Sequence, residues 1–149
     1  MIGRPGPGRG VPGSSAVRRL GLATVVGLLI PADRGEPVAL VALGLRASQL
    51  SDAIGGGLLE DALYADCEGA GYTFYLDEQR VAKGLPHNDR AAVLSARLGH
   101  VDRSWLAGLR GEVLVLGYDE HLDDVSVPPS VVDAAACCGL AVQRVREGR

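Results

Sequence analysis

The feature that most constrains the fold is an apolar run at residues 20–30 (LGLATVVGLLI), which ends at Pro31. It is shorter than the roughly 18 residues that a membrane-spanning helix needs. Two arginines precede it, so its outline also fits the apolar region of a secretory signal. The following segment, PADRGEP, lacks the small-x-small cleavage site of such signals. We therefore predict a buried strand at residues 24–30, with an export signal as the alternative.

The chain divides into segments of different composition. Residues 1–13 hold five glycines and three prolines, and residues 1–19 hold four arginines and no acidic residue. Such a segment cannot join a hydrophobic core, so we expect residues 1–19 to be a disordered basic leader or the product of a misplaced start. A compact domain is predicted over residues 20–145 and a flexible tail over 146–149. Residues 20–142 hold 8 basic and 17 acidic groups, a net charge of 8 − 17 = −9.

Short strands and short helices alternate along the predicted domain. A second apolar strand at residues 37–43 follows the first closely enough to form a hairpin. Helical spacing indicates helices at 46–54, from Asn88 to Gly99, and at 130–138. Further strands are predicted at 58–65, 72–76, 112–117 and 140–145. The pattern predicts one α+β domain: a mostly antiparallel sheet of five or six strands, with three short helices on one face.

Several residues have predicted structural roles at the ends of these helices. Gly55, Gly56 and Gly57 follow the first helix and would end it, because glycine adopts the left-handed conformation that helix ends often need. Since they do not precede a helix, they do not match a phosphate-binding loop. Pro86 and Asn88 introduce the second helix, and Asn88 is its predicted N-cap.

Four stretches of the sequence resemble one known family: LLIP, IGGG, YLDEQRVAKGLPHNDRAAVLSARLG and GEVLVLGYDE. They are similar to a family of small proteins from actinobacteria, their plasmids and their phages, which is known as a domain of unknown function. The most specific part is LPHNDRAAVL, in which Asn88 stands at the family's usual asparagine. The resemblance covers roughly residues 25–120. It implies that the fold begins near the first strand, and it brings no established activity or cofactor.

Two groups of polar residues are candidates for chemistry. The segment YDEHLDD places Asp119, His121 and Asp123 together, and oxygen and imidazole ligands of this kind can hold a divalent cation. His87 with Glu78 would form an acid–base pair if the chain folds back between them. Each group also has a simpler interpretation, as a solvated acidic connection and as turn polarity. A metal-dependent or acid–base hydrolase is therefore the alternative function.

No catalytic or cofactor motif stands out, so we expect no cofactor and a protein that is not an enzyme. The function favoured here is an accessory module that binds an unidentified protein partner, linked to plasmid or phage biology. An exposed sheet edge or an aromatic face would form the interface, with Tyr64, Tyr72, Tyr75 and Trp105 as candidate interaction residues. An acidic, antirestriction-like inhibitor is a further alternative. The acidic body argues against general nucleic-acid binding, and no membrane binding is expected. Three cysteines without a disulfide or zinc spacing fit a cytoplasmic location.

Overall fold

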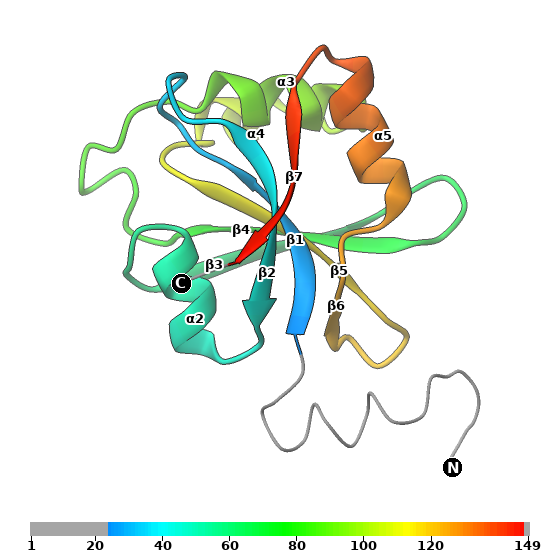
Figure 1. Cartoon of the computed structure of the whole chain (residues 1–149). Coiled ribbons are helices and arrows are strands. Elements are labelled where there is room, and N and C mark those ends of the chain that lie inside the picture. Colours follow the sequence, from blue (N-terminus) through cyan, green and yellow to red (C-terminus); the bar gives the residue numbers. More distant parts are fainter. Residues whose placement is uncertain (1–23, 148–149) are drawn as a thin grey trace.

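The computed structural model describes residues 24–147 (Figure 1). The predicted leader at residues 1–19 and the last two residues of the predicted tail lie outside this range. Within it, seven strands and four helices form one sheet with its covering helices. The strands are β1 (Thr24–Ile30), β2 (Val38–Gly44), β3 (Leu59–Ala65), β4 (Gly71–Asp77), β5 (Val113–Tyr118), β6 (Asp124–Val125) and β7 (Val142–Glu147). The helices are α2 (Ala47–Ala53), α3 (Asp89–Arg97), α4 (Arg103–Ala107) and α5 (Pro129–Cys137).

The strand order in the sheet is β3-β4-β5-β1-β2-β7, and β6 pairs with β5 beside this path. All of these neighbours are antiparallel except β2 and β7, which are parallel. The α+β class with a mostly antiparallel sheet is therefore confirmed. The apolar run supplies β1, which lies between β5 and β2 and forms the predicted hairpin with β2. Among residues 24–147, no helix combines the length and the hydropathy that crossing a membrane requires.

The sheet separates two hydrophobic cores, because successive side chains of a strand point to opposite faces. Leu28 and Ile30 of β1 lie in the first core, with Val113 and Val115 of β5 and with apolar residues of α3 and α5. The second core takes the other face of the same strands, including Leu114 and Leu116, and packs against Leu50 and Ile54 around α2. Figure 1 accordingly shows α3, α4 and α5 grouped together and α2 apart from them.

The structure differs from the prediction in three details of the same fold. Helix α2 packs on the opposite face from α3 and α5, whereas all three helices were predicted on one face. The sheet also contains the two-residue strand β6, and α4 is an additional helix of five residues. Elements this short carry too little periodicity to be recognised. Gly55, Gly56 and Gly57 all have positive φ angles of 91–104° directly after α2, as predicted for its end.

Candidate functional site

Strand β3 is one edge of the sheet, and within residues 24–147 it pairs only with β4. The backbone N–H of Glu78 donates to the carbonyl of Leu58 at 2.8 Å, just before β3 begins. Since hydrogen-bonded pairs alternate along antiparallel strands, the even-numbered residues of β3 bond to β4. The N–H and C=O groups of Leu59, Asp61, Leu63 and Ala65 therefore point outward, away from the sheet. Such a row of groups is a template for one more strand.

Apolar and acidic side chains line this open edge, and they differ between the two faces of the sheet. Leu63 is 44 % exposed on the face shared with α2, beside the exposed Asp61. Tyr64 lies on the other face, partly buried against the first core. Leu58 is also exposed, immediately before the strand. An added strand would therefore meet apolar side chains on both faces of β3.

An aromatic cluster supports the β3 edge on the face of α3 and α4. Tyr64 stacks on the imidazole of His100, with ring centroids 3.7 Å apart, and meets Trp105 edge-on at 5.7 Å. Trp105 Nε1 donates to Ser95 Oγ at 2.7 Å, and Ser95 Oγ donates to the His100 carbonyl at 3.1 Å. Tyr72 completes the cluster through a hydrogen bond between its hydroxyl and His100 Nε2. These contacts hold Tyr64 in one position at the edge.

Burial sets the protonation of the two hydrogen-bonded rings in this cluster. It lowers the pKa of His100 below its ordinary 6.5, so the imidazole is neutral near pH 7 and its Nε2 accepts from Tyr72. Burial, with the nearby Tyr64, Asp66 and Tyr118, raises the pKa of Tyr72 to about 12. The Tyr72 hydroxyl therefore keeps its proton as the donor, and the cluster carries no charge of its own.

The structure places the four predicted interaction residues differently. Tyr64 and Trp105 lie partly exposed in the cluster beside the open edge. Tyr72 is only 1 % exposed, so it cannot be a surface contact, and its prediction as an interaction residue is wrong. Tyr75 points to the other face and donates its hydroxyl to Asp124 at 2.8 Å. Its burial and the bond to Asp124 raise its pKa.

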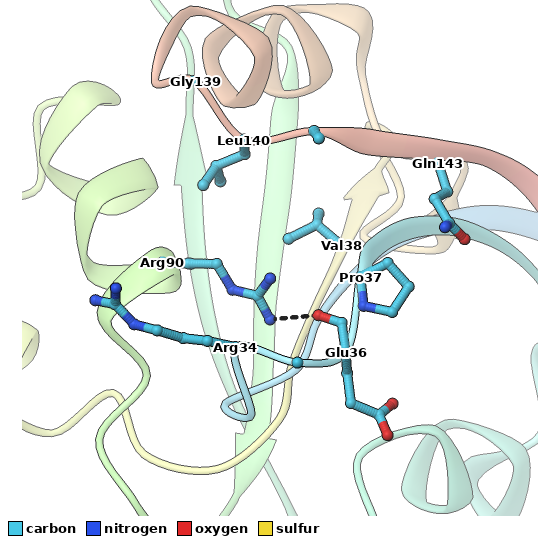
Figure 2. A pocket seen from close by; sticks show the side chains of 10 residues that line it. Arg34, Glu36, Pro37, Val38, Arg90, Gly139, Leu140 and Gln143 are labelled. Atoms are coloured by element: carbon cyan, nitrogen blue, oxygen red, sulfur yellow. Dashed lines mark hydrogen bonds between the residues drawn. The ribbon is translucent and has the colours of Figure 1, made fainter.

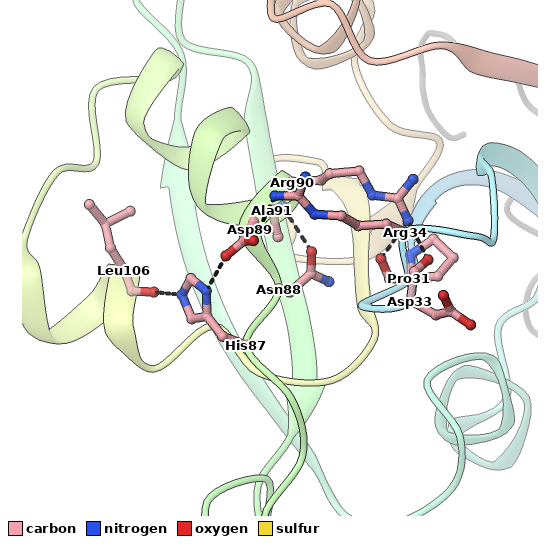
Figure 3. A network of polar contacts seen from close by, with 9 residues as sticks. All are labelled: Pro31, Asp33, Arg34, His87, Asn88, Asp89, Arg90, Ala91 and Leu106. Carbon is pink, nitrogen blue, oxygen red and sulfur yellow. Dashed lines mark hydrogen bonds and ion pairs between the residues drawn. The ribbon is translucent and has the colours of Figure 1, made fainter.

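His87 pairs with Asp89 and not with the predicted partner Glu78 (Figure 3). Its Nδ1 lies 2.7 Å from Asp89 Oδ1, and its Nε2 lies 2.9 Å from the carbonyl oxygen of Leu106. Both partners are acceptors, so both contacts are hydrogen bonds only when the ring carries two protons. These partners raise the pKa of His87 and favour imidazolium. A ring whose two nitrogens both face hydrogen-bond acceptors, and whose pKa is raised, is a poor general base.

The His87–Asp89 contact predicts a pH-dependent contribution to stability. The raised pKa of His87 means that its contribution is complete below pH 6.5 and is lost as the pH rises through the folded-state value. His87 and Arg34 lower the pKa of Asp89 below 3.8, so its contribution is complete above pH 3.8 and is lost as the pH falls through the folded-state value. We expect His87→Ala to lower the midpoint of urea unfolding more at about pH 5.5 than at about pH 8.5.

The comparison must be the difference between the wild type and His87→Ala at each pH. His100 acts in the opposite direction, because its lowered pKa gives a contribution that is complete above pH 6.5 and is lost as the pH falls. The pH dependence of stability of the wild type alone would combine the contributions of His87 and His100. An equal loss of stability at both pH values would show that His87 does not act through its charge.

The acidic segment after β5 closes a turn. Asp119 Oδ1 accepts from the backbone N–H groups of His121 at 2.9 Å and Asp123 at 3.0 Å. The backbone N–H of Asp119 donates to the carbonyl of Asp123 at 3.0 Å, and Leu122 between them has a φ of 64°. Among the residues of the described range, no group of three His, Cys, Asp or Glu side chains is placed to hold a metal ion. The side chain of Asp119 is thus engaged with the backbone, as in other Asx turns.

Asn88 is the predicted N-cap of α3, and its side chain accepts from the Ala91 N–H at 3.0 Å. The same side chain is fully buried and donates to the carbonyls of Ile30 at 2.8 Å and Gly111 at 2.9 Å. Pro86 lies just before it, and its carbonyl accepts from the Gly111 N–H at 2.8 Å. This short segment therefore joins α3 to the end of β1 and to the loop before β5.

Three residues that organise these sites carry no signal in the local sequence. His100 follows a helix-ending glycine and matches no motif, yet it joins Tyr64 to Tyr72. Arg80 donates to the Gly108 carbonyl at 2.5 Å and to Glu60 Oε1 at 2.9 Å, which ties β3 to the end of α4. Arg90 donates to three carbonyls of the β1–β2 loop. The partners of all three lie far away in the sequence, so no local spacing marks them.

Comparison with known proteins gives a likeness in fold. No family model and no curated protein matches the chain. Among solved structures, the crystal structure of small RNA methyltransferase HEN1 is similar, with a TM-score of 0.52 and 16 % sequence identity. The similar region covers 77 % of this chain and 16 % of that chain, so this chain spans a small part of HEN1. At this identity the likeness concerns the fold alone.

Proposed function

We propose that this chain is a non-enzymatic accessory module that binds an extended segment of a partner protein as a further strand beside β3. The observation that carries the proposal is the open edge of β3, whose outward backbone groups belong to Leu59, Asp61, Leu63 and Ala65. Strand addition of this kind takes its affinity from backbone hydrogen bonds and its specificity from alternate side chains. Leu63 and Tyr64 provide apolar contacts for those side chains on the two faces.

Charge around the edge favours a basic partner segment. Asp61, Glu68 and Glu78 are exposed on β3 or on the turns that flank it. The basic side chains of the same region are already paired, since Arg80 Nη1 lies 2.9 Å from Glu60 Oε1 and Lys83 Nζ lies 2.5 Å from Asp77 Oδ2. Exposed acidic groups steer and select positively charged segments. The partner we propose carries Lys or Arg residues alternating with apolar ones.

The alternatives from the sequence have less support. The hydrolase would need His87 as a base or Asp119 as a metal ligand, and both side chains are engaged otherwise. An acidic, antirestriction-like inhibitor would also act through exposed carboxylates, but it needs them spaced along a surface like phosphates. The link to plasmids and phages stays a prediction from the sequence resemblance.

Site-specific crosslinking tests the proposal. A photoreactive amino acid is placed at Leu63, and in a second protein at Val93, which is similarly exposed (49 %) on α3. We expect a covalent adduct from host lysate at position 63 and none at position 93. Mass spectrometry of the adduct should map the contact to an extended partner segment that contains Lys or Arg. Equal labelling at both positions, or a partner segment that is helical or acidic, would contradict the proposal.

A further inference from the structure

A pocket with a volume of about 480 Å³ opens near β2 and β7, at the opposite edge of the sheet from β3 (Figure 2). It lies between the β1–β2 loop, the first turn of α3 and the connection from α5 to β7. Pro37, Val38 and Leu140 give it an apolar wall, and Gln143 of β7 lines its rim. The guanidinium of Arg90 enters it from α3. The pocket is therefore an apolar recess with a positive charge at one end.

Hydrogen bonds fix the guanidinium of Arg90 in place, but some of its N–H groups have no acceptor among the described residues. Its Nη2 donates to the carbonyls of Pro31 at 2.7 Å, Asp33 at 2.9 Å and Glu36 at 2.8 Å, which fixes the guanidinium against the loop. Its Nε is buried and has no hydrogen-bond partner among the described residues. A guanidinium has five N–H groups, and a buried unpaired donor costs free energy. Among the described residues, Nη1 makes no hydrogen bond and is not buried, so it is the donor that a ligand in the pocket can reach.

The charges around Arg90 leave the positive end of the pocket available. Arg34 lies alongside Arg90 in Figures 2 and 3, and its terminal nitrogen pairs with Asp89 at 2.6 Å. Its side chain is 72 % exposed, so this ion pair is weak and the side chain can turn. The carboxylate of Glu36 also lines the pocket but points away from Arg90 (Figure 2). The Arg34 guanidinium points toward Asp89 and away from that of Arg90 (Figure 2), so the Arg90 guanidinium is the charge that faces the apolar wall. A positive charge beside an apolar wall favours an anion with a hydrocarbon part.

We propose that this pocket binds a small organic acid, with its carboxylate on Arg90 and its hydrocarbon chain against Pro37, Val38 and Leu140. A carboxylate has the planar geometry that a guanidinium binds best, and in the pocket it would accept from Nη1, which does not bond to the carbonyls of the β1–β2 loop. Arg34 turns from Asp89 to supply the second positive charge. The site is independent of the β3 edge, because β3 and β7 are opposite ends of the strand order.

The test is an NMR titration that follows the Arg90 side chain itself. Sodium hexanoate is added to the ¹⁵N-labelled protein, and the Nε–Hε signal of Arg90 is identified by its loss in Arg90→Lys. We expect a saturable shift of this signal. Hexan-1-ol, which lacks the charge, should give none, and acetate, which lacks the apolar chain, should bind more weakly. Arg34→Gln should weaken the binding of hexanoate, whereas Arg90→Lys should reduce it by at least about tenfold.

Two results would overturn the proposal. One is an Arg90 Nε–Hε signal that does not move as hexanoate is added. The other is an equal response to hexanoate and hexan-1-ol, which would show apolar binding without recognition of the carboxylate. The titration of the wild-type protein decides both, so the result does not depend on whether Arg90→Lys folds. It is also separate from the crosslinking at Leu63, so each of the two proposals can fail without the other.

Discussion

Replacing Asn88 by alanine is expected to lower the free energy of unfolding by about 3 kcal/mol. The side chain of Asn88 is fully buried, and it makes one hydrogen bond to the Ala91 N–H and two to the carbonyls of Ile30 and Gly111. Alanine would leave all three partners without their bond at a site that water does not reach. The measurement is urea unfolding followed by circular dichroism.

The matched control is Asp102→Ala at the N-cap of α4. Asp102 accepts from the Trp105 N–H at 3.0 Å, but its side chain is exposed and makes no other hydrogen bond or ion pair among the described residues. Loss of an N-cap alone costs about 1 kcal/mol. The difference between the two variants therefore measures what the buried donors of Asn88 add. If both variants lost the same stability, the bonds to Ile30 and Gly111 would contribute nothing.

The contacts of Asn88 also show what can and cannot be predicted from local sequence. Its position before Asp89 and an apolar helix face predicts an N-cap, and the structure has that cap. Its two other bonds reach Ile30 and Gly111, which lie 58 and 23 residues away in the chain. A cap is decided by its nearest neighbours, whereas a buried cross-link is decided by how distant segments pack. The sequence therefore predicted the helix and not the junction.

The same distinction holds for the strands and for the candidate site. The strands are local patterns, and β1 was predicted with the bounds that the structure gives it. That β3 lies at the edge follows from the strand order, which depends on pairings between distant segments. The strand at residues 72–76 was predicted, but its sequence alone could not tell that the side chain of Tyr72 would be buried. For this reason the interaction residues were partly wrong.

Replacing Leu63 by proline is expected to weaken capture of the partner segment by at least about tenfold. Proline lacks the N–H group, and in β3 the N–H of Leu63 points outward to the position of the added strand. An edge strand tolerates proline where its N–H faces solvent, so the sheet should stay folded. The measurement is the yield of partner capture, together with urea unfolding of each variant.

Two further variants separate the effect of losing the outward N–H at residue 63 from the effects of a damaged strand and of a changed side chain. Ala62→Pro removes an N–H that bonds to β4, so we expect it to lower the free energy of unfolding by about 3 kcal/mol, clearly more than Leu63→Pro does. Leu63→Thr keeps the outward N–H and introduces a β-branched side chain, which suits a strand, so it should retain most of the capture. The proposal requires that capture depend more on the N–H group of residue 63 than on its side chain. If Leu63→Pro bound the partner as well as the wild type, the added strand could not form at this edge, because its hydrogen bond at position 63 would have no donor.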